Sequence, residues 1–300
     1  MTFNEFVKQF ATEDQCRDYL YQIRWSEGFI CPKCGGNKCW KVRGVLYECI
    51  KCCHQTSVIA GTIFQDTRKP LQSWFTAIWW ITTQKYGASA EGLQQVLGLS
   101  SYETAWTWLH KIRKAMVNPN RAKLSGDVEI DETYIGGVNT GGKSGRGSEN
   151  KTLVIVATEI KSKALGRIRL NVIKDASGRS LKNFIEKNVE PESKIITDAW
   201  KGYSRLEEKG YEREIHNQAQ SNTDDQLLPH VHLVISLLKR WLLGTHQGAI
   251  HSKHLQAYLD EFVFRFNRRT SAKRGLLFYR LLENAMKTAP TTLDEITGKN

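Results

Sequence analysis

Four cysteines in two Cys-x-x-Cys pairs constrain this chain more than any other feature. Cys31 and Cys34 form the first pair, and Cys49 and Cys52 form the second. Each pair places two thiolates on one turn, and four thiolates complete the closed tetrahedral shell of a structural Zn²⁺ site. All seven cysteines precede residue 54, and this clustering with an odd count favours a metal site in a reducing cytosol over a disulfide framework. The sequence therefore predicts a zinc ribbon at residues 26–60.

Other potential ligands lie close to these pairs. Cys16 falls on the apolar side of a helical segment within residues 1–25 and is predicted to be a core residue. Cys39, Cys53 and His54 are alternative ligands, although Cys53 directly follows a better-spaced cysteine and is interpreted as a bystander. Because a closed shell leaves no open coordination position, the role of the zinc is expected to be structural, with the ribbon presenting basic residues to DNA.

The charge balance suggests the kind of partner. The chain has 300 residues and a formal net charge of +12, and an excess of this size points to a polyanion, of which DNA and RNA are the commonest. A hydrophobic content of 40% is that of a globular protein and excludes a disordered one. The longest apolar run, around residues 74–83, is too short to span a bilayer, and the N-terminus is charged and unlike a signal peptide.

Residues 61–120 have the pattern of an all-helical region. A short helix at 90–97, a turn containing Gly98 and a longer helix at 102–116 give the outline of a helix-turn-helix. An ordinary helical hairpin is the alternative. The net positive charge of the chain and the neighbouring zinc ribbon favour DNA binding. The predicted contacts near the end of the second helix are Lys111, Arg113 and Lys114.

Residues 121–290 change to mixed strands and helices, before a tail at 291–300. Strands are predicted around Asp131 and at 153–158, 167–173, 194–198 and 211–215, and helices at 180–188, 203–209, 228–243 and 252–268. This order matches an RNase H-like domain with a mixed sheet. The predicted fold is therefore multidomain, with a zinc ribbon, an all-α helix-turn-helix-like region and an α/β RNase H-like catalytic domain.

Two strand carboxylates are the candidate catalytic groups. Asp131 lies among β-branched neighbours, where a buried charge is costly unless a cation or metal compensates it; a solvent-facing position on an edge strand is the alternative. Asp198 ends a buried-looking strand, where open α/β sheets tend to place their sites. If the strands are neighbours, the carboxylates converge, and Mg²⁺ or Mn²⁺ is the ion that oxygen ligands prefer. A pair of such ions supports phosphoryl transfer.

A third ligand is expected after Asp198. His232, Ser236 and Lys239 form one polar stripe on an otherwise apolar helix, which suits a metal ligand followed by a phosphate-binding cation. The solvent-facing side of a packed helix is the alternative, and His230 is a competing ligand that points away from the stripe.

Three other carboxylates are rivals for this position. Glu132 is expected to point to the strand face opposite Asp131. Asp260 and Glu261 lie on a helix rich in phenylalanine and arginine, and they are expected to pair with its basic residues in a structural or DNA-facing network. Those basic residues are Arg265, Arg268 and Arg269.

Five further stretches, taken with the cysteine pairs, resemble a known family. They are AGTIF (60–64), VEIDETYIGG (128–137), ITDAWKGY (196–203), LLKRWLLGTH (237–246) and YLDEFVFRFNRR (258–269). In this order they resemble a bacterial insertion-sequence transposase with an N-terminal zinc ribbon and a DDE-type RNase H-like core. The family often has Glu seven residues before a Lys, where this chain has His232 before Lys239, so the resemblance implies a DDH-like site.

The resemblance implies both chemistry and partners. Asp131, Asp198 and His232 would hold Mg²⁺ or Mn²⁺, and Lys239 and Arg240 would contact DNA. The implied function is binding of an element's terminal inverted repeats, followed by strand cleavage and transfer into target DNA. The implied setting is double-stranded DNA in the bacterial cytoplasm and nucleoid, with a homodimer or higher synaptic complex and no membrane. A DNA-binding regulator with an inert core, or a non-mobile RNase H-like nuclease, is the alternative.

Overall fold

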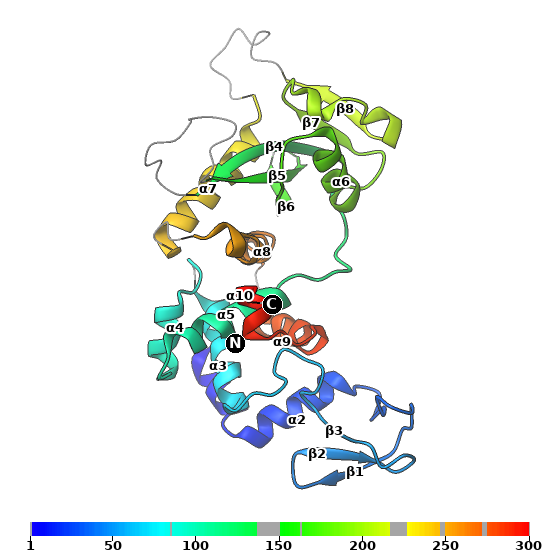
Figure 1. The fold of residues 1–300 in the computed structure, drawn as a ribbon, viewed down its shortest axis with the longest axis vertical. Helices are drawn as coiled ribbons and strands as arrows, with labels where there is room; N and C mark the ends of the chain where they lie inside the picture. The colour runs from blue at the N-terminus through cyan, green and yellow to red at the C-terminus, as the bar shows by residue number, and fades with distance from the viewer. Residues whose placement is uncertain are drawn as a thin grey trace. The chain divides into compact units, whose positions relative to one another are not determined.

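A computed structural model gives the fold and describes residues 2–84, 86–136, 151–162, 164–216, 227–246, 250–271 and 275–299. The chain forms two compact units (Figure 1). Unit 1 combines Met1–Asn118 with Ser271–Asn300, and unit 2 is Pro119–Thr270. No helix within the described ranges is long and apolar enough to cross a membrane.

Unit 1 combines a small antiparallel sheet with helices from both ends of the chain. Its sheet has the order β1-β2-β3. Its elements are α1 (Phe3–Gln9), α2 (Glu13–Arg24), β1 (Cys39–Val42), β2 (Leu46–Cys49), β3 (Gln55–Ser57), α3 (Leu71–Thr83), α4 (Ala90–Leu97), α5 (Tyr102–Ala115), α9 (Leu276–Lys287) and α10 (Leu293–Thr297).

One carboxylate joins two of these helices. The oxygens of Glu13, at the start of α2, accept hydrogen bonds from the backbone N–H groups of Leu71 and Gln72 at 3.0 and 3.2 Å. Pro70 precedes α3 and forms no side-chain cap. Glu13 therefore supplies the acceptor and the negative charge that are favourable at the N-terminus of α3.

The predicted short helix, turn and longer helix are confirmed as α4 and α5. Gly98 ends α4 in the left-handed conformation, with φ of 60°, which glycine adopts without steric cost. Helix α9 packs against α3 and α5, with Phe278 fully buried. Residues 276–287 thus belong to unit 1, whereas the sequence pattern placed them with the catalytic domain that precedes them.

Unit 2 is a mixed α/β structure. Its elements are β4 (Asp127–Ile135), β5 (Thr152–Lys161), β6 (Ala164–Val172), α6 (Gly178–Asn188), β7 (Lys194–Thr197), η1 (Lys201–Tyr203), η2 (Glu207–Lys209), β8 (Glu212–Ile215), α7 (Pro229–His246) and α8 (Ser252–Phe266). The sheet order is β6-β5-β4-β7-β8. β5 is antiparallel to both its neighbours, while β4, β7 and β8 are parallel. This is the RNase H-like arrangement that the element order predicted.

Both faces of this sheet are covered. Side chains of α7 and α8 pack on one face in a core that includes Val154, Val156 and Ile168. On the other face, α6 and the segment that follows β7 pack against Val128 and Ile130 (Figure 1). Alternate residues of β4 therefore point into different cores, and this alternation decides which of its carboxylates can share a site.

The predicted helix at 203–209 is wrong. The structure has two short 3₁₀ turns, η1 and η2, in its place. Arg205 lies between them with φ of 61°, in the left-handed region that interrupts a right-handed helix. The packing of Tyr203, which is fully buried, fixes the first turn against the sheet.

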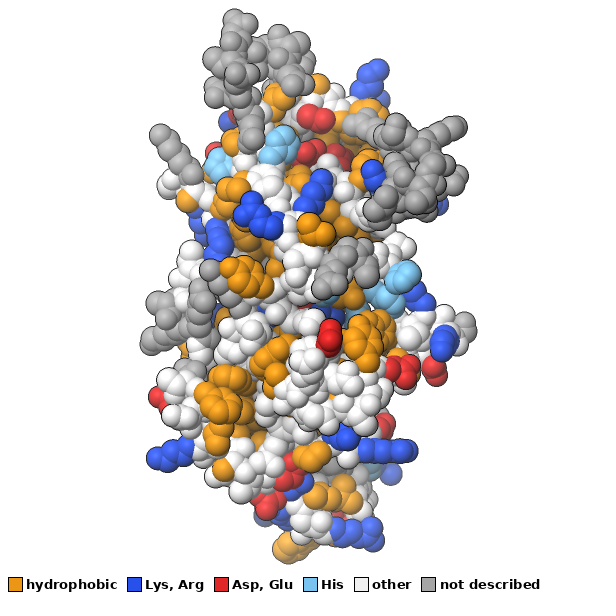
Figure 2. Space-filling model, turned by 90° about the vertical axis from the view of Figure 1, so that its left-hand side faces the viewer, with side chains coloured by type: hydrophobic (Ala, Val, Ile, Leu, Met, Phe, Trp, Pro, Cys, Tyr) orange, Lys and Arg blue, Asp and Glu red, His pale blue; other side chains and the backbone are white. Residues whose placement is uncertain are grey.

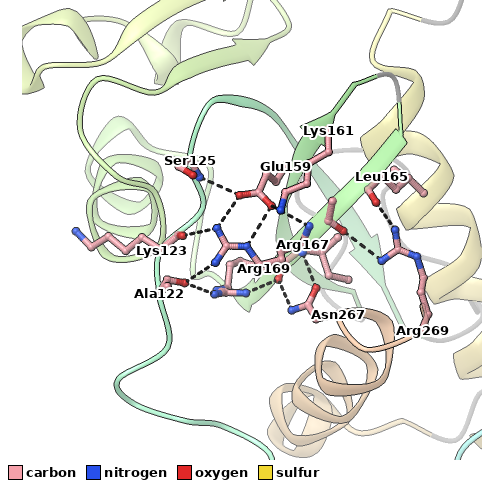
Figure 3. Close-up of polar contacts among 12 residues, drawn as sticks. Ala122, Lys123, Ser125, Glu159, Lys161, Leu165, Arg167, Arg169, Asn267 and Arg269 are labelled. Carbon is pink, nitrogen blue, oxygen red and sulfur yellow. Dashed lines mark hydrogen bonds and ion pairs between the residues drawn. The ribbon is translucent and has the colours of Figure 1, made fainter. Parts of the chain in front are cut away.

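A polar network fastens the segment leading into β4 to strands β5 and β6 (Figure 3). Glu159 is only 1% exposed and accepts hydrogen bonds from Arg167 at 2.6 and 3.1 Å and from the backbone N–H of Ser125 at 3.2 Å. Arg169 donates to the carbonyl oxygen of Ala122 at 2.6 Å. Burial alone raises the pKa of Glu159, but these hydrogen bonds outweigh it and lower the pKa to about 2.

Glu159→Gln is expected to lower the free energy of unfolding by about 2 kcal/mol, because it removes the negative charge from a largely buried pair. A depressed folded-state pKa stabilises the fold above the unfolded value of 4.5, so the difference from wild type should shrink as the pH falls toward 2. Urea unfolding across this pH range measures it. Lys161→Gln, which removes an exposed partner 3.7 Å from Glu159, is the control and should change stability by less than about 0.5 kcal/mol. Equal losses of stability in the two variants would contradict a stabilising role for the buried Glu159 charge.

Candidate functional site

Asp131 and Asp198 lie on neighbouring parallel strands. Asp131 is within β4, and Asp198 directly follows β7. Because Glu129 lies opposite Ile196, the same register continued by two residues brings Asp131 opposite Asp198. The structure thus places the two carboxylates together, where the sequence predicted that they would converge.

His232 approaches this pair from α7. Its Nε2 atom lies 3.2 Å from Oδ2 of Asp131, and its side chain is 40% exposed. The three predicted ligands line one pocket of about 400 Å³. The residues that line it are Asp131, Asp198, Ala199, Trp200, His216, Leu227, Leu228 and His232.

The pKa of Asp131 reflects the charges and hydrogen bonds around the pocket. Burial raises the pKa of Asp131, and the charge of Asp198 raises it further. The backbone N–H of Glu132, 2.8 Å from Oδ1 of Asp131, and the nearby His232 act in the opposite direction. Oδ1 of Asp198 accepts a hydrogen bond from the backbone N–H of Trp200 at 3.0 Å. A buried carboxylate whose proton affinity is raised by a neighbouring carboxylate favours a bound cation.

This donor set fits a hard divalent ion. Mg²⁺ and Mn²⁺ prefer carboxylate oxygens, and an imidazole nitrogen suits Mn²⁺ as well. Among the described residues, only the four ribbon cysteines form a group of three or more potential ligands with all ligand atoms within 4.8 Å. Asp131, Asp198 and His232 do not meet this criterion, so at least one pair of their ligand atoms is more than 4.8 Å apart.

Ser236 and Lys239 do not line the pocket. The Ser236 hydroxyl donates to the carbonyl oxygen of Leu233 at 2.9 Å within α7. Lys239 and Arg240 are exposed farther along the helix. The predicted polar stripe therefore exists on α7, but His232 is its member at the pocket, and the catalytic role of Lys239 stays a prediction.

Glu129 is a buried carboxylate that the sequence interpretation missed. It is 4% exposed and lies on the same face of β4 as Asp131. Oε1 of Glu129 lies 2.7 Å from Nδ1 of His230, and Oε2 accepts a hydrogen bond from the backbone N–H of Val231 at 2.7 Å. His230, the competing ligand, is thus paired with Glu129 and not with Asp131. The spacing of two residues between Glu129 and Asp131 in a strand was the sequence signal that both side chains face the same side of the sheet.

His216 was also missed. It follows β8 and lines the pocket. Its Nδ1 lies 2.8 Å from the carbonyl oxygen of Leu227, and its Nε2 lies 2.6 Å from Oε1 of Glu214. The hydrogen bond with Glu214 raises the pKa of His216. No sequence pattern links His216 to Leu227, because the two residues do not share a helix or a strand.

The rival carboxylates lie outside the pocket lining. Glu261 is fully buried and accepts a hydrogen bond from Nε of Arg265 at 2.9 Å, the pairing that the sequence predicted. Asp260 accepts one from Gln256 at 3.0 Å, and burial raises its pKa to about 6. Glu132 points to the other face of β4, where its charge is one of the causes of the raised pKa of Tyr203, after burial.

The four ribbon cysteines fit a tetrahedral zinc site. The Sγ atoms of Cys31 and Cys52 are 3.7 Å apart, and those of Cys34 and Cys49 are 3.6 Å apart. A tetrahedron with Zn–S bonds of about 2.3 Å has edges of about 3.8 Å. A Cβ added to Gly36 would lie 3.1 Å from Sγ of Cys49, so the backbone is packed directly against the thiols. The predicted ligand set is confirmed as a cluster suited to structural Zn²⁺.

The remaining cysteines are outside this cluster. Cys16 is fully buried, and burial raises its pKa to about 12, as expected for the predicted core residue. Cys53 is exposed, and Cys39 shares a hydrogen bond with Tyr21. Neither of these, nor His54, belongs to the group of four.

The predicted DNA contacts on α5 need one correction. Arg113 is 1% exposed and donates to the carbonyl oxygen of Ala88 at 3.2 Å, so it faces the interior and does not reach DNA. Its position, four residues after buried Leu109, puts it on the packed face of the helix. Lys111 is half-buried, and Lys114 is exposed and hydrogen-bonded to the hydroxyl of Thr291.

The arginines of α8 and the residues after it have structural partners. Arg265 pairs with Glu261. Arg268 lies 4.1 Å from the ring centroid of Phe264, and Arg269 lies 4.0 Å from that of Phe266 and bonds to the carbonyl oxygen of Gly166 at 3.2 Å. On the face shown in Figure 2, the Lys and Arg side chains of the described residues are scattered among other types.

Two family models match the chain. One, described as a transposase zinc-ribbon domain, matches residues 11–55. The other, described as an ISXO2-like transposase domain, matches residues 123–267. An uncharacterized protein in transposable element ISH50 of Halobacterium salinarum is 25% identical over 281 residues, which cover 86% of this chain and 92% of that protein.

Solved structures show a weaker likeness. A pre-cleavage Mos1 transpososome has a TM-score of 0.29 and 12% identity, over 76% of this chain and 82% of that one. A Mos1 transposase paired-end complex with the left transposon end has a TM-score of 0.25 and 12% identity, over 75% and 82%. Scores this low leave the fold assignment to the strand order itself.

Proposed function

The chain belongs to the insertion-sequence transposases that carry an N-terminal zinc ribbon, and we propose that it binds the terminal inverted repeats of its element and catalyses metal-dependent cleavage and transfer of DNA strands. One observation carries the chemical part. Asp131 and Asp198 meet on neighbouring parallel strands with His232 opposite them, in one pocket. Such a set suits phosphoryl transfer, and the net charge of +12 suits a DNA substrate.

Each side chain has a separate task in this proposal. Asp131 and Asp198 provide the two carboxylates, and His232 adds a neutral ligand that leaves the charge of the set unchanged. Bound Mg²⁺ or Mn²⁺ would activate the attacking oxygen, of water or of a 3′-hydroxyl, and stabilise the leaving oxygen. Lys239 and Arg240, exposed on the same helix as His232, would contact the phosphates of the bound strand.

Recognition of the DNA is assigned to unit 1. The zinc ribbon and the α4–α5 pair would bind the repeats, with Lys111 and Lys114 as phosphate contacts on α5. Two element ends must be handled together, so a homodimer or a higher synaptic complex on nucleoid DNA in the cytoplasm is the proposed working form. Such a complex would cleave both element ends within one assembly.

Nicking of end-bearing DNA tests the proposal. Wild-type protein is expected to nick duplexes that carry the inverted repeats bracketing its gene, with Mg²⁺ or Mn²⁺ and not with a chelator. Duplexes of the same length and scrambled sequence are the control. Binding to the repeats without nicking in either metal would indicate an inert-core regulator. Equal cleavage of both duplexes would indicate a nuclease without end recognition.

A further inference from the structure

The buried Glu129 carboxylate has no role in the chemistry proposed above, although it lies two residues before Asp131. Both of its oxygens contact the first turn of α7: one meets the imidazole of His230 and the other meets the backbone N–H of Val231, each at 2.7 Å. These partners lie about one hundred positions away along the chain. The contact therefore joins the middle of the sheet to the start of a distant helix.

The first turn of α7 is where such a contact has most effect. The N–H groups of a helix's first turn have no partner within the helix, and the helix dipole favours a negative charge beside them. α7 begins at Pro229, so Val231 and His232 both lie in this turn. Helix ends fray unless they are capped, and the position of His232 thus depends on how well this end is held.

A second contact holds the residues just before the helix. His216, at the end of β8, binds the carbonyl oxygen of Leu227 at 2.8 Å and is itself held by Glu214 at 2.6 Å. Leu227 precedes the first residue of α7 by two positions. The start of the helix is thus attached to the sheet at β4 through Glu129 and at β8 through His216.

We propose that Glu129 is a positioning residue that fixes the first turn of α7 and thereby holds His232 opposite Asp131 in the metal pocket, with His216 supporting the segment before the turn. This inference rests on the proposed function, since it assumes that the pocket binds a divalent ion. Residues that orient a metal ligand typically change metal affinity by about 10- to 100-fold when they are replaced.

A double-mutant cycle with Mn²⁺ tests this role without DNA and without turnover. Mn²⁺ affinity is measured by titration calorimetry on the zinc-loaded full chain for wild type, Glu129→Gln, His232→Ala and the double variant. Glu129→Gln is expected to weaken Mn²⁺ binding about tenfold in the wild-type background and less than about twofold when His232 is absent. No change, or the same loss in both backgrounds, overturns the proposal.

Two further variants keep the result interpretable. Asp127→Asn, an exposed carboxylate at the start of the same strand, is the matched control and should bind Mn²⁺ like wild type. If Glu129→Gln does not fold, as judged by zinc content and circular dichroism, His216→Ala takes its place in the cycle. His216→Ala is expected to weaken Mn²⁺ binding in the wild-type background but not in the His232→Ala background. An unchanged Mn²⁺ affinity in the wild-type background again overturns the proposal.

The outcome separates this role from the proposed function. If the Asp131→Asn variant binds Mn²⁺ as tightly as wild type does, the pocket is not the metal site and the proposed chemistry fails. If Asp131→Asn and His232→Ala both weaken binding while the effect of Glu129→Gln is absent or independent of His232, the metal site stands and only the positioning role is lost.

Discussion

Asp131→Asn is expected to abolish strand cleavage while binding to the element ends remains nearly intact. Asparagine has almost the same size as aspartate but carries no charge, so the pocket loses half of the negative charge contributed by its two carboxylates. A metal ion contributes several kcal/mol to stabilising a phosphoryl-transfer transition state, and its loss corresponds to a decrease in rate of at least about 1,000-fold. Asp198→Asn is expected to behave in the same way.

Two assays on the same protein samples check this result. Cleavage and strand transfer are followed on labelled repeat DNA, and end binding is followed by fluorescence anisotropy without divalent metal. Asp127→Asn makes the same chemical change on the same strand, at an exposed position outside the pocket lining, and should match wild type in both assays. Full strand transfer by either the Asp131 or the Asp198 variant would rule out this metal site.

The paired aspartates could be predicted because local sequence carries the information. Asp131 lies inside one predicted strand, and Asp198 lies at the end of another. The two carboxylates meet if these strands pair in parallel, and the RNase H-like strand order contains that pairing. The choice of His232 over His230 could also be made from helical phase. In the structure, Nε2 of His232 lies 3.2 Å from Asp131 while His230 contacts Glu129, and the role of His232 as a ligand stays a prediction.

Long-range contacts account for what the sequence did not predict. Glu129 lies two residues before Asp131 in a strand, so the sequence shows that both side chains face the same side of the sheet. The partners of Glu129 could not be predicted, because they lie on a helix distant in sequence. The pairing of His216 with Leu227 has no local pattern at all. Helix α9 comes soon after unit 2 in sequence, and the packing of side chains such as Phe278 assigns it to unit 1.

Basic residues were the least predictable class. A lysine or arginine near the end of a helix reads equally well as a DNA contact or as a structural donor. Arg113 donates to a backbone carbonyl group in the interior, and Arg268 and Arg269 stack on phenylalanine rings. Helical phase was the one local signal that distinguished Arg113 from exposed Lys114, because burial follows the apolar face of α5.

Cys52→Ser is expected to release the zinc and weaken binding to the element ends by about tenfold or more, whereas Cys53→Ser is expected to preserve both. The two cysteines are adjacent, but Sγ of Cys52 lies 3.7 Å from that of Cys31 within the cluster of four, and Cys53 is exposed outside it. Structural zinc typically contributes about 10–16 kcal/mol to the folding of small domains, so a ribbon of three short strands is not expected to hold its shape without it.

Zinc content and end binding together test both parts of this expectation. One zinc per chain is predicted for wild type and Cys53→Ser, and much less than one for Cys52→Ser. Retention of zinc by Cys52→Ser would contradict the ligand assignment. Loss of zinc with unchanged end binding would leave the ligands in place but would remove the ribbon from DNA recognition. In that case the α4–α5 pair would carry the specificity, because it is the remaining predicted DNA-binding element of unit 1 and its helices contain no zinc ligand.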